Sequence, residues 1–170
     1  KSSRGLGDVY KRQVRSMSRG LVVTIDGAAG TGKSTAARRL ARELGWQFLD
    51  TGAMYRAAAL AMLEAGEDPA DSAAAAARVQ SIRVDFDWAA SPPEIRLDGR
   101  GVGHRIRDLD VSAAASAIAI HPTVRERLKQ LQREVAASCE GLVSEGRDQG
   151  SVVFPDALVR FFLTCLLYTS

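Results

Sequence analysis

The chain has 170 residues, 46% of them hydrophobic and 25% charged, which fits one globular domain and excludes wholesale disorder, a collagen repeat and a disulfide scaffold. No apolar run reaches the roughly 18 residues of a membrane span, so we expect no membrane partner. The net charge is +3, but residues 1–19 hold six basic groups against one acid, and the other 151 residues hold 17 basic and 19 acidic groups. This distribution argues against a nucleic-acid partner.

Both ends of the chain differ in character from its body. Residues 1–16 have neither the apolar core of a secretory signal nor a helical period. Within them, residues 7–13 resemble translated sequencing adapters, as do residues 165–170. We therefore expect non-native tails at both ends of a folded core over residues 17–164, with Met17 as the natural start and a natural chain that continues past Thr164. An Arg-rich transit peptide is the alternative for the first tail.

Strand and helix patterns alternate along the body. The first strand is expected over residues 21–25, where β-branched apolar residues run together, and the first helix over 33–44, where apolar residues recur at helical spacing. The other expected helices cover 52–65, 71–80, 110–120 and 122–138, and the other strands 46–49, 82–88, 94–98, 141–145, 152–154 and 159–163. This order predicts the α/β class, a three-layer α/β/α domain with a parallel sheet, and a small antiparallel β insertion at about 82–107.

A glycine-rich segment between the first strand and the first helix satisfies the P-loop pattern G-x-x-x-x-G-K-[ST]. Such a loop binds polyphosphate through its backbone N–H groups and the helix dipole, while Lys33 reaches the β- and γ-phosphates and the Ser34 hydroxyl binds Mg²⁺. The residues expected at the nucleotide are Gly27, Ala28, Ala29, Gly30, Thr31, Gly32, Lys33, Ser34 and Thr35. The alternative is a glycine-rich turn with a solvated lysine.

A second phosphate site is indicated in the segment Leu49–Arg56. Thr51 stands where a helix N-cap is expected, and Arg56 follows Gly52 by just over one helical turn. A hydroxyl, a helix N-terminus and a guanidinium would then converge on one anion. The alternative is that Arg56 is a surface arginine.

Four segments occur in the order found in the bacterial cytidylate kinases, a branch of the nucleoside monophosphate kinases, and the similarity runs from about Gly20 to Thr164. The segments are 25–35, 49–56, 122–125 and 145–157. This resemblance implies a cytoplasmic enzyme that uses ATP and Mg²⁺ to phosphorylate CMP and dCMP, with UMP a poor acceptor, and that is a monomer when complete.

The resemblance also implies roles for individual side chains. The implied acceptor residues are Thr51, Arg56 and Arg147 for the phosphate and Ser116, Arg125 and Asp148 for the cytosine. Lys33 and Arg147 would be the catalytic side chains. Cytosine presents an amino donor and two acceptors, so a carboxylate beside a guanidinium matches the cytosine edge but does not match the uracil edge. Ser112 is an alternative to Ser116, and the chain departs from the usual family pattern at Ala28, Gln149 and Ser151.

Two other functions remain open. A kinase of a small-molecule hydroxyl, similar to shikimate or gluconate kinases, would need an acid such as Asp50 to remove a proton. A nucleoside monophosphate needs no base, because its second phosphate pKa near 6 leaves the attacking oxygen ionised at pH 7. The chain could also be an inactive nucleotide-binding fragment. Because the lid arginines of the family would follow Thr164, we expect the 170 residues alone to be weakly active or inactive.

Overall fold

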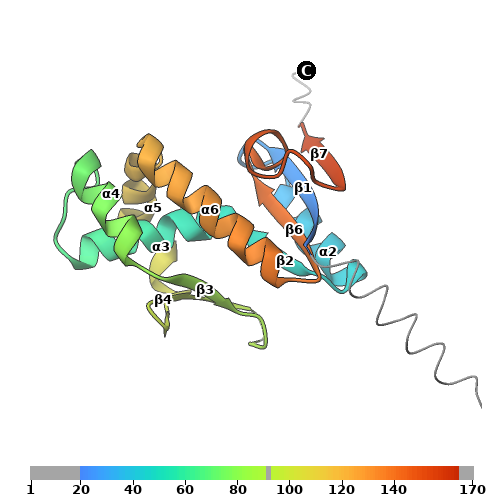
Figure 1. Cartoon of the computed structure of the whole chain (residues 1–170), viewed down its shortest axis with the longest axis horizontal. Helices are drawn as coiled ribbons and strands as arrows, with labels where there is room; N and C mark the ends of the chain where they lie inside the picture. The colour runs from blue at the N-terminus through green and yellow to red at the C-terminus, as the bar shows by residue number, and fades with distance from the viewer. Residues whose placement is uncertain (1–19, 91–92, 165–170) are drawn as a thin grey trace, which may run out of the picture. The chain divides into compact units, whose positions relative to one another are not determined.

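The computed structural model describes residues 20–90 and 93–164, so both expected tails and Met17 lie outside the described residues. The chain forms two compact units, whose elements are labelled in Figure 1. The first unit contains the residues up to Leu49 and those from Arg133 onward, and the second contains Asp50–Gln132. Within the described ranges, no helix combines the length and apolar character needed to cross a membrane.

The first unit is built on a four-stranded sheet with the order β2-β6-β1-β7. Its central strand β1 (Leu21–Gly27) pairs in parallel with β6 (Gly141–Gly146) on one side and β7 (Val159–Leu163) on the other. The strand β2 (Gln47–Asp50) lies next to β6. Because β1 and β6 are parallel, the loops that follow them emerge at the same edge of the sheet.

The helix α2 (Lys33–Leu44) covers one face of this sheet. It begins after Gly32 and ends at Gly45, both of which have positive φ, a conformation that glycine adopts without strain. Its apolar stripe is small: Ala37 and Ala41 are buried. They pack with Val23, Ile25 and Val143 of the sheet, with Leu40, Trp46, Phe48 and Leu163 at the border of this cluster.

The second unit is organised around α3 (Thr51–Glu64), which is apolar on nearly every side and accordingly buried. Its neighbours are α4 (Ser72–Ser81), α5 (Leu109–Ile118), the 3₁₀ turn η1 (Arg105–Arg107) and a small antiparallel sheet. That sheet contains β3 (Val84–Asp87), β4 (Glu94–Leu97) and β5 (Arg100–Gly101). The helix α6 (Pro122–Ser138) begins in this unit and carries the chain back to the first. The insertion expected at about 82–107 therefore falls inside the second unit.

The α/β class, the parallel sheet and the small antiparallel sheet are confirmed, but the strand predicted over 152–154 is wrong. The chain there forms η2 (Gln149–Val153), a single turn of π-helix. The Phe154 N–H donates to the Gln149 carbonyl at 2.7 Å, which closes the turn five residues apart. Two adjacent valines favour a strand locally, whereas bonds from distant residues stabilise the turn. The short strand β5 was not predicted.

Candidate functional site

The glycine-rich loop begins where β1 ends, at the edge of the first unit's sheet where β6 also ends. Gly27 pairs with Leu163 of β7, and a Cβ on Gly27 would lie 2.6 Å from the Leu163 carbonyl oxygen. Gly30 and Gly32 have φ values of 77° and 79°, which side chains rarely adopt. The glycines therefore let the backbone turn sharply, with Ala28 to Gly30 exposed to solvent.

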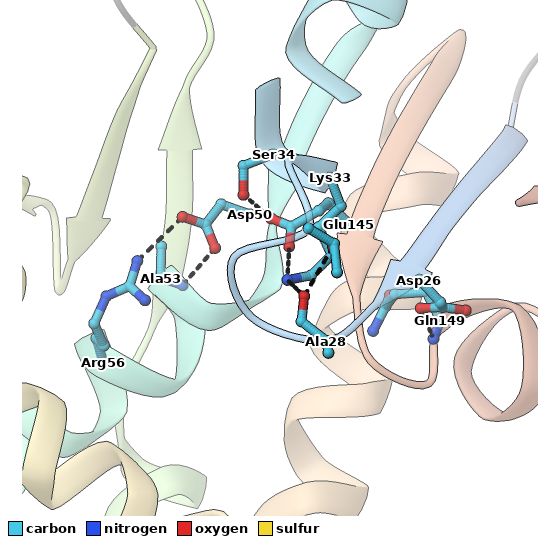
Figure 2. A network of polar contacts seen from close by, with 10 residues as sticks. Asp26, Ala28, Lys33, Ser34, Asp50, Ala53, Arg56, Glu145 and Gln149 are labelled. Atoms are coloured by element: carbon cyan, nitrogen blue, oxygen red, sulfur yellow. Dashed lines mark hydrogen bonds and ion pairs between the residues drawn. The ribbon is translucent and has the colours of Figure 1, made fainter. Parts of the chain in front are cut away.

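Three polar side chains converge beside this loop. The Lys33 Nζ lies 3.3 Å from Glu145 Oε1, and the Ser34 hydroxyl donates to Glu145 Oε2 at 3.0 Å. The Lys33 ammonium also donates to the Ala28 carbonyl at 3.2 Å. Figure 2 shows Lys33 and Ser34 pointing at the Glu145 carboxylate. The Lys33 side chain is only 12% exposed, so the alternative of a solvated lysine is wrong.

The segment after β6 carries two more of the predicted residues. Arg147 is exposed and Asp148 is half-buried. The next residue, Gln149, is 2% exposed and accepts a hydrogen bond from the Ser144 hydroxyl at 2.8 Å. The backbone N–H of Gln149 donates to the carboxylate of Asp26, which is 6% exposed. The two predicted side chains thus stand between a buried strand and a turn whose first two residues are buried.

In the second unit, the start of α3 differs from the prediction in one respect. The N-cap is Asp50, whose Oδ1 accepts the Ala53 N–H at 3.1 Å, and Thr51 is the first helical residue. A carboxylate has a second oxygen available, and here Asp50 Oδ2 accepts from Arg56 Nη2 at 3.1 Å. A Cβ on Gly52 would lie 2.9 Å from Arg56 Nη1. Glycine at that position leaves room for the guanidinium, which is ion-paired and therefore not simply a surface arginine.

The other predicted residues of the second unit lie on two helices. Ser116 is exposed on α5, and its hydroxyl donates to the Ser112 carbonyl at 3.2 Å. That bond is local to the helix and leaves the Ser116 oxygen able to accept another hydrogen bond. Arg125 is exposed on the first turns of α6. Both side chains can therefore be reached from solvent.

The structure adds three acids that sequence reasoning did not place at the phosphate sites, each near the end of a strand. Asp26 is the penultimate residue of β1, Glu145 the penultimate residue of β6, and Asp50 the last residue of β2. Asp50 was considered only as the base of a hydroxyl kinase. The signal that could have found them is an acid that follows a buried apolar run, because strand ends at one sheet edge are where polar groups meet ligands.

The family model "Cytidylate kinase" matches residues 23–169. The cytidylate kinase of Mycolicibacterium paratuberculosis is 49% identical over 148 residues, which are 87% of this chain and 65% of that protein. The cytidylate kinase of Bordetella pertussis is 47% identical over 142 residues, which are 84% of this chain and 61% of that protein. The cytidylate kinase of Limosilactobacillus reuteri is 42% identical over 152 residues, which are 89% of this chain and 66% of that protein.

The chain thus spans just under two-thirds of the length of these curated relatives. The matched region includes the glycine-rich loop with Lys33 and Ser34, the Glu145 carboxylate and the Asp50–Arg56 pair. A match over most of the chain, together with identities near one half to proteins of that name, shows that this chain belongs to the cytidylate kinase family.

Proposed function

We propose that the protein transfers the terminal phosphoryl group of ATP to CMP or dCMP with the help of Mg²⁺. The observation that carries this proposal is the convergence of Lys33 and Ser34 on Glu145 beside a glycine-rich loop. Backbone N–H groups of such a loop and the N-terminus of α2 favour an anion. Family membership supports CMP as the acceptor.

Lys33 would act on the donor phosphates. In the structure, its ammonium contacts the Glu145 carboxylate and the Ala28 carbonyl. A triphosphate carries more negative charge than one carboxylate, so bound ATP would draw the ammonium onto its β- and γ-phosphates. Lys33 would then stabilise the charge that spreads over the transferring group.

The Ser34 hydroxyl and the Glu145 carboxylate fit a magnesium ion. Both offer hard oxygen donors, they lie 3.0 Å apart, and P-loop enzymes hold Mg²⁺ through a loop serine and an acid of a neighbouring strand. Among the described residues there is no group of three or more His, Cys, Asp or Glu that could hold a metal by itself. An ion held by Ser34 and Glu145 would take its other ligands from phosphates and water, and it would neutralise phosphate charge when bound.

The acceptor phosphate is assigned to Thr51, Arg56 and Arg147. Asp50 holds the Arg56 guanidinium by one oxygen while it caps α3 with the other, so the arginine is oriented by its own chain. An oriented guanidinium binds a phosphate by two parallel hydrogen bonds and loses less side-chain entropy on binding.

The base is assigned to Ser116, Arg125 and Asp148. The Asp148 carboxylate would accept from the cytosine amino group, where uracil presents a carbonyl oxygen, and Arg125 would donate to the ring acceptors. A uracil carbonyl facing Asp148 would leave the carboxylate without its donor. Discrimination of this kind is typically strong because an unpaired buried polar group costs free energy.

The hydroxyl-kinase alternative is less well supported. A base that removes an alcohol proton must point a carboxylate oxygen at the acceptor hydroxyl. Both oxygens of Asp50 already accept hydrogen bonds, one from Ala53 and one from Arg56. Transfer to a nucleoside monophosphate needs only positioning and charge neutralisation, because the acceptor oxygen is already ionised.

An ADP-release assay tests the proposal. The chain is incubated with Mg²⁺ and ATP and with CMP, dCMP, UMP, shikimate or gluconate in turn, and nucleotide binding is measured in parallel by calorimetry. Because the 170 residues alone are expected to be weakly active or inactive, we expect at most slow turnover with CMP and dCMP, still less with UMP, and none with the two hydroxy acids. Binding of ATP and CMP without any turnover would instead support a nucleotide-binding fragment.

The remaining assignments are part of the same proposal. We assign residues 17–164 to one kinase core, and a monomeric state and a cytoplasmic location to the complete protein. ATP and CMP are free in the cytoplasm, and the phosphate-binding groups assigned above all come from one chain. Sedimentation equilibrium of the complete protein and its fractionation from cells test these points.

A further inference from the structure

The turn η2 begins directly after Arg147 and Asp148, so its first residues determine where these two side chains stand. The Asp148 side chain does not cap the turn. The first two backbone N–H groups of η2 donate to the carboxylate of Asp26 in β1. Gln149 N–H donates to Oδ1 at 2.8 Å, and Gly150 N–H donates to Oδ2 at 2.7 Å. Asp26 and Gln149 face each other in Figure 2. The partners are more than 120 residues apart in the chain.

These two bonds are of the strong kind. Asp26 is 6% exposed, and Gln149 and Gly150 are buried, so solvent competes little for either partner. Bonds from N–H groups to a carboxylate are roughly twice as strong as those between neutral groups. Because each carboxylate oxygen holds a different peptide group, Asp26 fixes both the position and the orientation of the backbone after Asp148.

The far end of η2 is held independently. Arg133 of α6 donates from Nε to the Val153 carbonyl at 2.8 Å and from Nη2 to the Val152 carbonyl at 3.2 Å. Near the start of the turn, Arg160 of β7 donates to the Gly150 carbonyl at 3.2 Å. Loss of the Asp26 bonds would leave the Gly150 carbonyl bonded to Arg160 but release the two N–H groups next to Asp148. The start of the turn would therefore loosen, while its far end stays attached to Arg133.

We propose that Asp26 is a positioning residue for recognition of the cytosine base of the acceptor nucleotide. It acts through the backbone of η2 on Asp148 and Arg147, and the inference rests on the proposed roles of these two residues. Asp26 also directly precedes Gly27, the first residue of the glycine-rich loop. One carboxylate thus links the start of the phosphate loop to the segment proposed to recognise the acceptor.

Three variants of the chain test this role by their affinities for CMP, UMP and ATP. Asp26→Asn keeps the size of the side chain, but its amide nitrogen faces one of the two N–H groups and cannot accept. We expect the CMP-over-UMP preference to fall about tenfold, with ATP affinity within about twofold. The Gln149 and Gly150 amide protons should shift in NMR spectra and exchange faster. Arg133→Met is the control, since it releases the other end of η2, and Asp148→Asn reports on the base contact itself.

The outcomes separate the inference from the proposed function. If Asp148→Asn narrows the preference and Asp26→Asn does not, the positioning role is wrong and the role of Asp148 stands. If Asp148→Asn changes nothing, the proposed base contact fails and the inference fails with it. If Arg133→Met reduces the CMP-over-UMP preference as much as Asp26→Asn does, any loosening of η2 has this effect, and the inference is overturned. If Asp26→Asn does not fold, Asp26→Glu takes its place, because it keeps the charge but displaces it. Asp26→Glu must then reduce the CMP-over-UMP preference, and an unchanged preference refutes the proposal.

Discussion

Replacement of Glu145 by glutamine tests the glycine-rich loop most directly. In the parent chain, Glu145 is an ion-pair partner of Lys33 at 3.3 Å and the acceptor for the Ser34 hydroxyl at 3.0 Å. Glutamine keeps the shape and one acceptor oxygen, so Ser34 retains a partner. Lys33 loses its counter-charge, and its ammonium keeps only the bond to the Ala28 carbonyl.

The geometry sets the expected magnitude. Removal of one partner from a fully buried pair costs about 3–5 kcal/mol. The Lys33 and Glu145 side chains retain 12% and 8% exposure, and the Ser34 bond survives, so we expect a loss of about 2 kcal/mol in the free energy of unfolding. That is roughly a 30-fold change in the unfolding equilibrium constant. The melting temperature should fall by about 4–8 °C.

Urea unfolding followed by circular dichroism measures this loss. Glu43→Gln is the matched control, because it removes the same charge from an exposed position on α2. A parallel titration should show that Glu145→Gln weakens ATP binding about tenfold with Mg²⁺ present and much less without it. If Glu145→Gln is as stable as the Glu43→Gln control, the Lys33–Glu145 pair does not hold the loop and the reasoning fails.

Three further substitutions test separate parts of the site. Lys33→Met should lower phosphoryl transfer to CMP by a factor of about 10² or more while CMP affinity is kept, and steady-state kinetics with normal turnover would contradict the donor assignment. Gly27→Ala should lower the free energy of unfolding by about 1–3 kcal/mol, because its Cβ would lie 2.6 Å from the Leu163 carbonyl oxygen. A denaturation midpoint equal to that of the parent would show that the backbone of the sheet shifts at little cost in stability. Asp50→Asn should retain the cap of α3 but lose the charge that orients Arg56. We therefore expect the KM for CMP to rise several-fold while the melting temperature stays within a few degrees of the parent. An unchanged KM would show that Arg56 does not need Asp50 for its orientation.

Local signals in the sequence were sufficient for most elements. The glycine-rich loop lies between a strand and a helix as predicted, and the first helix covers Lys33–Leu44 as expected. Hydrophobic spacing and the glycines at both ends are properties of neighbouring residues, so they act before any tertiary contact forms. The resemblance carried by short motifs likewise led to the family to which the chain belongs.

Tertiary structure decided the partners of the polar groups. Ser34 and Glu145 meet across 111 residues, and Gln149 and Asp26 across 123. No periodicity records such pairs, because they arise only when the parallel strands β1 and β6 bring their ends to one edge of the sheet. For the same reason the two valines at 152 and 153, which favour a strand by themselves, belong to a π-helical turn: Asp26 and Arg133 hold its two ends, and those bonds outweigh the local preference.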